Sequence, residues 1–241
     1  MALNVLRQDP SLRIVSLLTT VTKDYERISI HGVRRMLLAL QAQAIGMDLI
    51  EVAIPAQCTH DIYEAKMVAA LTSPPLADLD THAFADLFLQ DVRAYRETNL
   101  AKLNKTAIFP LWGRNTTALA RDFIELGFRA VVVSLDPRML SPNFAGRQFD
   151  EAFLEDLPDN VDPCGENGEF HTFVYDGPTF VRSVDVALGE VVTREGFVFQ
   201  DLLPLPNKNL EPSEVAADTP TLPVVRLRHT VETHSPLKEA T

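Results

Sequence analysis

The stretch VRRMLLALQAQAIGMDLIEVAIP, residues 33–55, has the pattern of a helix that leads directly into a strand. Apolar residues recur at helical spacing in its first part: Val33, Met36, Leu37, Leu40 and Ala44. Gly46 then stands where many helices end on a glycine. The run DLIEVAIP at residues 48–55 follows at once and is typical of a strand. A helix followed closely by a strand is the repeating unit of α/β proteins.

The same alternation continues on both sides of this stretch. RIVSLLTT, residues 13–20, is a nearly continuous apolar run, as in a strand that is buried on both faces. Further strand-like runs occupy residues 82–89, 106–112 and 128–135. Helical runs occupy residues 59–72, 91–104 and 115–127. This order predicts a doubly wound parallel sheet.

Capping residues and loop positions follow from the same pattern. Thr59 is expected to begin one helix, Asn115 or Thr116 is expected to begin another, and Gly127 is expected to end the latter. Ligands of open parallel sheets bind beyond the carboxyl ends of the strands. The loops of interest are therefore those after Thr20, Pro55, Ala85 and Pro110.

The character of the chain changes after about residue 150. Short β-like runs dominate at residues 169–175, 180–192 and 195–204, which indicates a smaller α+β portion. From about Pro204 the chain is rich in Pro, Thr, Ser and charge without periodicity, as in a disordered tail. We expect a nucleotide-binding α/β domain over residues 1–110, a smaller substrate-recognition domain over residues 111–203, and a tail over residues 204–241.

Composition narrows the possible functions. A formal charge of −11 and a pI near 5.0 argue against a nucleic-acid-binding surface, whereas ATP can still be held by backbone N–H groups and Mg²⁺. The two cysteines, Cys58 and Cys164, are not part of a metal-binding pattern, so we assign no metal-ligating residues. No signal peptide or membrane-spanning run is evident, and we expect a cytoplasmic protein.

The run DPCGENGEFHTFVYDGP, residues 162–178, is the strongest candidate for a binding element. Alternation along a strand places Glu169, His171, Phe173 and Tyr175 on one side, and Phe170, Thr172 and Val174 on the other. Gly165 and Gly168 permit a tight turn that would present Glu166, Asn167 and Glu169. Such groups can hold an ammonium, a Mg²⁺ or an amine-bearing substrate. The alternative is a solvated turn in front of a hairpin.

Two further positions are candidates for binding the nucleotide. His31 and Gly32 follow the first strand, where they can approach a ligand, although a lone histidine is more often structural. Asp86 follows another strand at the expected ligand-facing end of the sheet.

Several of these strings together resemble the diphthine–ammonia ligase family, a branch of the PP-loop ATPases. The resemblance covers roughly residues 1–200 and rests on IHGVRRMLLALQAQAIG, DLFLQDVRAYRE, PLW, GFRAVVVSLDPRML, GRQFD and DPCGENGEFHTFVYDGPTF. It implies an adenine nucleotide α-hydrolase-like (HUP) fold and ATP-dependent amidation with Mg²⁺. A substrate carboxylate would attack the α-phosphate of ATP and release pyrophosphate, and ammonia would then displace AMP.

The resemblance also implies roles for residues. The positions that match the substrate-recognition element are Gly165, Glu166, Asn167, Gly168, Glu169, His171 and Thr172. Nucleotide binding is expected at His31, Gly32 and Asp86, and the catalytic residues are not identified. The amidated carboxylate would be diphthine on elongation factor 2 in an archaeal or eukaryotic source, and a different, unidentified one in a bacterial source.

The chain departs from the family in one respect that bears on activity. The family's phosphate-binding loop has the form Ser-Gly-Gly-x-Asp-Ser, and no Gly-Gly pair occurs in this sequence. MALNVLRQDP resembles the end of the helix that follows this loop, so the strand in front is missing too and would leave unpaired edges. Either Met1 is an internal methionine of a longer protein, which we favour, or the chain is naturally short and inactive. A smaller departure is Ala85, where the family usually has Gly.

These observations leave three functional hypotheses. The first is an ATP-dependent amide ligase that is inactive, and binds ATP weakly, as the chain is written. The second is a nucleotide- or metabolite-binding protein without catalysis. The third is a PP-loop enzyme that modifies tRNA, against which the acidic charge and the unpaired cysteines argue. For the first hypothesis we expect Glu169→Ala to abolish amidation and to spare the fold, because the site is expected to be exposed.

Overall fold

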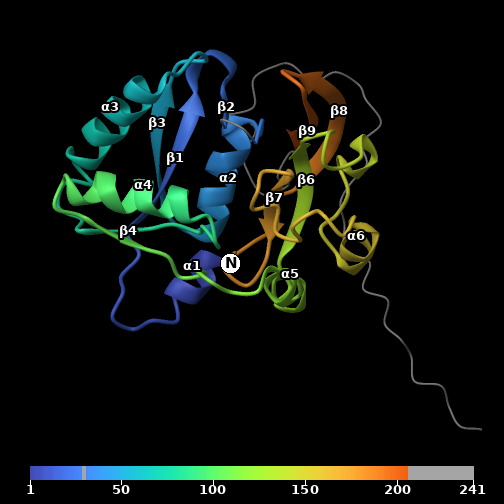
Figure 1. Ribbon diagram of the computed structural model, residues 1–241, viewed down its shortest axis with the longest axis horizontal. Coiled ribbons are helices and arrows are strands. Elements are labelled where there is room, and N and C mark those ends of the chain that lie inside the picture. Colours follow the sequence, from blue (N-terminus) through green and yellow to red (C-terminus); the bar gives the residue numbers. More distant parts are fainter. Residues whose placement is uncertain (29–30, 206–241) are drawn as a thin grey trace, which may run out of the picture.

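A computed structural model describes residues 1–28 and 31–205, and the predicted tail beyond residue 205 lies outside the described residues. We call residues 1–110 the N-terminal part and residues 111–205 the C-terminal part. Figure 1 shows the first as two short sheets with their helices and the second as one larger sheet, with α2 (Arg35–Ile45) between them. Within the described residues, no helix has the length and apolar character that crossing a membrane requires.

The N-terminal part contains two pairs of parallel strands. β1 (Ser16–Thr22) pairs in parallel with β3 (Asp48–Ile54) over its whole length, and β4 (Thr81–Ala83) pairs in parallel with β5 (Thr106–Ile108). The short β2 (Arg27–Ile28) runs antiparallel to the last two residues of β1. Helices α1 (Ala2–Leu6), α3 (His60–Leu71) and α4 (Gln90–Ala101) complete this part. Strands and helices alternate here as the sequence predicted.

The local signals for these elements are confirmed. Gly46 ends α2 in the left-handed conformation, with φ +73°. The Thr59 hydroxyl accepts a hydrogen bond from the Ile62 backbone and so begins α3. The Asn115 side chain accepts one from the Ala118 backbone and begins α5 (Thr116–Glu125), and Gly127 follows its end with positive φ. Between the two alternatives for this last N-cap, the structure selects Asn115.

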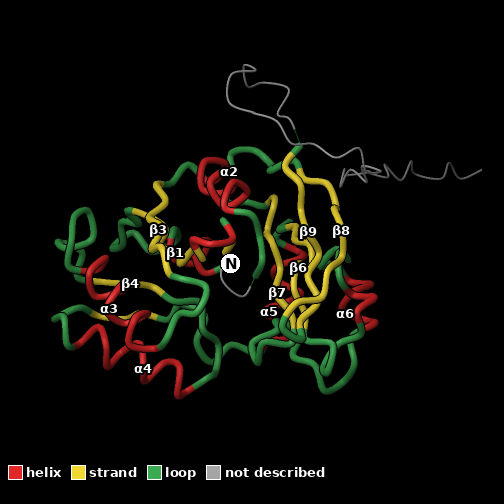
Figure 2. The backbone as a smooth tube through the Cα atoms, turned by 90° about the horizontal axis from the view of Figure 1, so that it is seen from above, coloured by secondary structure: helices red, strands yellow, loops and turns green. Residues whose placement is uncertain are grey.

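The C-terminal part is a four-stranded antiparallel sheet. Its strand order is β7–β6–β9–β8, with β6 at Arg129–Leu135, β7 at Phe170–Asp176, β8 at Val186–Arg194 and β9 at Phe197–Pro204. Helices α5 and α6 (Glu151–Asp156) lie against one face, and Figure 2 shows α2 beyond the other face. The prediction that residues 128–135 extend a parallel sheet is therefore wrong, because β6 pairs antiparallel with β7 and β9.

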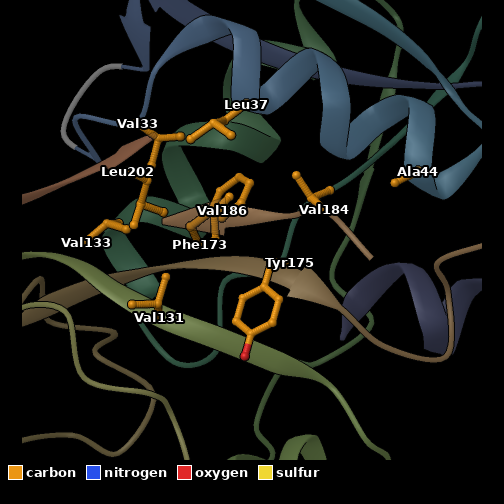
Figure 3. Close-up of a cluster of buried hydrophobic side chains, with 10 residues drawn as sticks. All are labelled: Val33, Leu37, Ala44, Val131, Val133, Phe173, Tyr175, Val184, Val186 and Leu202. Carbon is orange, nitrogen blue, oxygen red and sulfur yellow. The ribbon is translucent and has the colours of Figure 1, made fainter. Parts of the chain in front are cut away.

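The core of the C-terminal part explains the apolar run in β6. Val131 and Val133 point toward α2, where they meet Leu37, whereas Ala130 and Val132 point toward α5 and α6. Figure 3 shows the α2-facing cluster, which also includes Phe173 and Tyr175 of β7. Because both faces of this sheet are covered, β6 is apolar at almost every position. The helix of the opening stretch thus packs across the boundary between the two parts.

Three strand predictions in the N-terminal part need correction. The run at residues 106–112 is a strand only over Thr106–Ile108, because the chain turns from Pro110 onward. The run at residues 13–20 is not buried on both faces, since β1 is only half-buried over Ser16–Thr20. Along these residues one edge of β1 has no strand partner in the described part of the chain. The run at residues 82–89 forms a strand only as far as Ala83, because the backbone beyond it bonds to other groups, such as the Glu166 side chain at Leu87.

Candidate functional site

A cavity of about 1390 Å³ lies beyond the carboxyl ends of β1 and β3. One wall comes from these strand ends, from the loop after β3 and from the N-terminus of α3: Thr20, Thr22, Ile54, Pro55, Ala56, Cys58, Thr59, His60 and Tyr63. The opposite wall comes from the β8–β9 hairpin: Gly189, Glu190, Val192, Arg194, Glu195, Phe197, Phe199, Asp201 and Leu203. Tyr25, Arg27, Ile28, Gly32 and Arg34 complete the lining. Of the four predicted ligand-facing loops, those after Thr20 and Pro55 border this cavity.

The hairpin turns one complete face toward the cavity. Along β9 the half-buried residues alternate with buried ones, and Phe197, Phe199 and Leu203 belong to the cavity-facing set. Val198 and Leu202 point the other way, into the two apolar cores. The cavity wall is therefore a pleated strand surface whose rear is anchored in the core.

Asp201 fastens this wall to the N-terminal part. Its carboxylate accepts hydrogen bonds from Arg27 at 2.9 Å and from Arg34 at 2.6 and 3.1 Å. Arg27 also donates to the Gly32 carbonyl at 2.6 Å. Burial raises the pKa of Asp201, but the hydrogen bonds from Arg34 and Arg27 outweigh it and leave that pKa below its ordinary value. We call Arg27, Arg34 and Asp201 the hairpin clamp.

Gly32 lines the cavity for a reason that the structure makes plain. Its φ is +68°, and a Cβ at this position would lie 2.6 Å from the Cδ1 atom of Phe199. The missing side chain therefore lets the Phe199 ring approach the backbone. The sequence predicted close approach of a ligand at Gly32, and the group that approaches in the structure is the hairpin itself.

His31 and His171 were predicted to serve different ligands, and the structure places them together. Their ring centroids lie 4.6 Å apart. Burial lowers the pKa of His31. Burial and the neighbouring His31 lower the pKa of His171 to about 4, although Glu169 opposes the shift. Both rings are therefore neutral at pH 7.

The 162–169 loop is held by its own side chains. The Asp162 carboxylate accepts hydrogen bonds from the backbone N–H groups of Cys164 and Glu166. Gly165 has φ +68°, and a Cβ there would lie 2.5 Å from the Phe170 carbonyl oxygen. Gly168 also has a positive φ, with open space around it. The predicted tight turn is confirmed.

Glu169 does not present its carboxylate to solvent, which corrects the expected exposed site. The residue is 1% exposed. Its Oε1 atom accepts hydrogen bonds from the Asp162 backbone at 3.0 Å and from the Asn167 side chain at 2.9 Å. Within the described residues its Oε2 atom has no hydrogen-bond partner. The physical reason is that Glu169 closes the loop from within by taking up these two donors.

Glu166 joins the loop to the N-terminal part. Its carboxylate accepts a hydrogen bond of 2.6 Å from the Leu87 backbone. Burial raises the pKa of Glu166, the backbone bonds from Leu87 and Phe88 oppose this, and the nearby Asp86 and Asp162 add to it. The net pKa lies above the ordinary value. The 162–169 loop therefore docks on the segment that follows β4.

Asp86, predicted to bind nucleotide, is engaged by Arg96. The Arg96 guanidinium donates to its two carboxylate oxygens at 2.6 and 3.0 Å. Thr172 lies between Phe170 and Val174 on the α6-facing side of β7, away from His171. Among the ten predicted site residues in the described chain, Gly32 is the one that lines the cavity.

The structure therefore forms two groups from the predicted residues. One joins Glu166 to the loop that carries Asp86, and the other joins His171 to His31, next to Gly32. Sequence reasoning missed the hairpin residues, including Arg194 and Phe197. The available signal was the run EGFVFQD, in which large apolar residues follow one another and therefore lie on both faces of the strand. A strand that packs only one face on a core needs them on that face alone. No group of three or more His, Cys, Asp or Glu side chains in the described residues is arranged to hold a metal ion.

Comparisons with known proteins identify the C-terminal part. Residues 115–201 match the family model described as the diphthamide synthase C-terminal domain. Proteins named diphthine–ammonia ligase from Bos taurus and Homo sapiens are each 32% identical to this chain over 117 residues, which are 46% of this chain and 44% of each relative. The one from Schizosaccharomyces pombe is 27% identical over 139 residues, or 56% of this chain and 22% of its own length. The chain thus aligns with less than half of these relatives.

Proposed function

We propose that this chain is a member of the diphthine–ammonia ligase family, which the match at residues 115–201 and the similarity to the named relatives support, and that its function is ATP-dependent amide formation. In this reaction a substrate carboxylate attacks the α-phosphorus of ATP, and the bond to pyrophosphate breaks. Ammonia then attacks the acyl carbon of the acyl-adenylate, and AMP leaves with the electron pair of the broken acyl–oxygen bond. The proton lost by the attacking nitrogen passes to solvent or to a nearby base.

The cavity is the observation that carries this proposal. It lies where parallel α/β sheets bind their ligands, and its opposite wall belongs to the domain that matches the family. Its volume is large enough for two ligands at once. We propose that the N-terminal part has the PP-loop, adenine nucleotide α-hydrolase-like fold, which the parallel pairs β1–β3 and β4–β5 support.

We assign ATP to the wall made by the strand ends. The hydroxyls of Thr20, Thr22 and Thr59 line this wall, and the N-terminus of α3 meets it at His60. Helix N-termini and hydroxyls favour phosphate groups. In this assignment Gly32 and the adjacent His31 lie at the inner end of the nucleotide. Asp86 does not line the cavity, and its contribution is to hold Arg96 in an ion pair.

The residues present do not by themselves form a binding site for Mg²⁺. In the described chain no three carboxylates or imidazoles converge on one point. In this proposal Mg²⁺ arrives bound to the ATP phosphates, where it neutralises charge. No protein ligand is assigned to it.

The 162–172 element has a positioning role in this proposal. We still assign the matching residues to the substrate part of the site. Glu166 and Glu169, however, contribute by holding other residues in position and not by contacting the substrate. Glu166 holds the loop against Leu87, and Glu169 fixes the start of β7, from which His171 reaches His31. No proton acceptor for the attacking nitrogen is assigned in this element, because His171 does not line the cavity and its pKa is lowered to about 4.

The partners of the reaction are ATP, ammonium and a carboxylate substrate. The relatives are named for diphthine, and we propose the same substrate, on elongation factor 2, if the source is archaeal or eukaryotic. In a bacterial source a different carboxylate would take its place. The chemistry of adenylation and amidation is the same in both cases.

ATP–pyrophosphate exchange tests this function. The assay is run on residues 1–241 and on the product of the longest reading frame that contains this sequence, with ammonium and candidate carboxylates. We expect carboxylate-dependent exchange from a chain that carries a phosphate-binding loop, and weak ATP binding by residues 1–241. Tight ATP binding without exchange in either protein would instead support a nucleotide-binding protein without catalysis.

A further inference from the structure

The cationic side chains that line the cavity differ in whether they form an ion pair. Arg27 and Arg34 are held by Asp201, and His60 lies 3.1 Å from Glu64. Arg194 is the remaining cationic side chain of the lining, and it has no ion pair within the described residues. An unpaired guanidinium at the edge of a cavity is suited to an anionic ligand group.

Arg194 ends β8 and is paired in register with an aromatic residue across a two-residue turn. Residues Glu195 and Gly196 connect β8 to β9 with φ values of +51° and +84°, as in the two-residue turns that match strand twist. Arg194 and Phe197 are directly paired across this turn. Side chains at paired positions on one face lie within contact distance. The Arg194 guanidinium and the Phe197 ring can therefore contact the same ligand.

The surface behind this pair is apolar. Val192 pairs with Phe199 one step further from the turn, and Leu203 continues the same face of β9. These residues are half-buried, whereas their neighbours Val198 and Leu202 are fully buried. A flat ligand can cover this strip and keep its anionic end at Arg194.

We propose that the hairpin face formed by Val192, Arg194, Phe197, Phe199 and Leu203 binds the carboxylate substrate, and that this substrate carries a planar or aromatic ring in addition to its carboxylate. That the bound carboxylate is the substrate of amide formation rests on the proposed function. That the hairpin face binds a carboxylate does not. Substrate recognition thus moves from the 162–172 element, which is closed by internal hydrogen bonds, to the hairpin.

The acidic residues of the hairpin support this division of the cavity. Glu190 and Glu195 line the same wall as Arg194. Their charges repel every anion on this side, but they repel the multiply charged triphosphate of ATP more strongly than a single carboxylate, which one guanidinium can match. The two ligands thus occupy opposite walls.

Binding of 2-naphthoate to residues 1–241, measured by calorimetry without ATP, tests the proposal. We expect saturable binding with a Kd below about 1 mM, and at least about tenfold weaker binding by Arg194→Ala and by Phe197→Ala. Arg121→Ala, at an exposed position of α5, and Phe88→Ala, at an exposed position after β4, are matched controls that leave the Kd unchanged. The uncharged 2-naphthamide should bind no better than naphthoate binds to Arg194→Ala.

Cys58 supplies a second measurement inside the cavity. It lines the strand-end wall, whereas burial raises the pKa of Cys164, the second cysteine, to about 12 and makes it unreactive. Naphthoate should slow alkylation of Cys58 by iodoacetamide in the wild-type protein and not in Arg194→Ala.

Absence of naphthoate binding, or equal binding by Arg194→Ala and wild type with a folded variant, would overturn the proposal. Because the probe needs no nucleotide, this result is independent of ATP–pyrophosphate exchange. Failure of exchange alongside Arg194-dependent binding would reject the ligase function and leave the hairpin site standing.

Discussion

The 162–169 loop and the tip of the β8–β9 hairpin are both glycine-containing turns that carry glutamates, and they use their side chains in opposite ways. In the loop, Glu166 and Glu169 accept hydrogen bonds from backbone and amide groups. At the hairpin tip, Arg194 and Glu195 have no ion pair within the described residues and border the cavity. The 162–169 loop has the more conspicuous sequence motif, yet its glutamates stabilise the fold and do not face the cavity.

This difference follows from backbone hydrogen bonding. The 162–169 segment is half-buried against β6, α5 and the segment after β4, and only Gly165 and Glu169 are fully covered, so several of its N–H groups take acceptors from the protein. Carboxylates two to seven residues away supply them. The hairpin satisfies its backbone through the β8–β9 ladder, and its side chains remain available for a ligand.

The largest expected difference between the two turns is at their glycines. Gly165→Ala should lower the free energy of unfolding by about 3 kcal/mol or more, because the left-handed conformation is strained for alanine and the new Cβ would meet the Phe170 carbonyl. Gly196→Ala, with φ +84° and open space around it, should cost only about 1 kcal/mol. Urea denaturation of both variants checks the order. Equal losses would show that the loop is no more tightly built than the hairpin.

The second expected effect is a pH dependence that comes from the His31–His171 pair beside the loop. Because the pKa of His171 is lowered to about 4 from 6.5, its contribution to stability is present above pH 6.5 and is lost as the pH falls toward 4. The loss should be on the order of 2–3 kcal/mol over this range.

Unfolding curves of His171→Asn, His31→Asn and the double variant measure this contribution. The single variants should flatten the pH dependence, and their effects should not add, because each ring contributes to the environment of the other. A wild-type profile that is flat between pH 6.5 and 4 would contradict the assignment.

The fold was predictable where a residue's role depends on its sequence neighbours. Gly46, Thr59 and Asn115 act within four residues of their partners, and each marks its helix end as expected. The direction of β6 was not predictable, because the run AVVVS is equally suited to a parallel strand and to an antiparallel one with both faces covered. The relevant cover is α2, nearly a hundred residues earlier in the chain.

The site was less predictable than the fold. The pattern at Glu169 gave the correct strand face and the wrong exposure, because the donors that surround it come from the turn that it closes. Arg194 and Phe197 carry no motif of their own. They become a pair through strand register and line a cavity through the clamp at Asp201.

Glu169→Ala tests whether the Glu169 carboxylate stabilises the 162–169 loop. The variant should lose about 2 kcal/mol of unfolding free energy, since two partly buried donors lose their acceptor, partly offset by removal of the unpartnered Oε2 atom. Glu169→Gln keeps an acceptor oxygen and should lose less than about 1 kcal/mol. Thermal unfolding of the two variants provides the measurement, and a fully stable alanine variant would return Glu169 to the binding residues.

The smallest effect on stability is expected at the hairpin clamp, where the effect on the cavity should be the larger one. Asp201→Asn removes the charge that holds Arg27 and Arg34 and should cost about 1 kcal/mol, because Arg34 is partly exposed. The hairpin should then open more often, and iodoacetamide should alkylate Cys58 several-fold faster. Asp122→Asn, which breaks the ion pair with Arg114 outside the cavity, should leave that rate unchanged. If both variants alkylate at the wild-type rate, the hairpin is positioned by its apolar rear face alone.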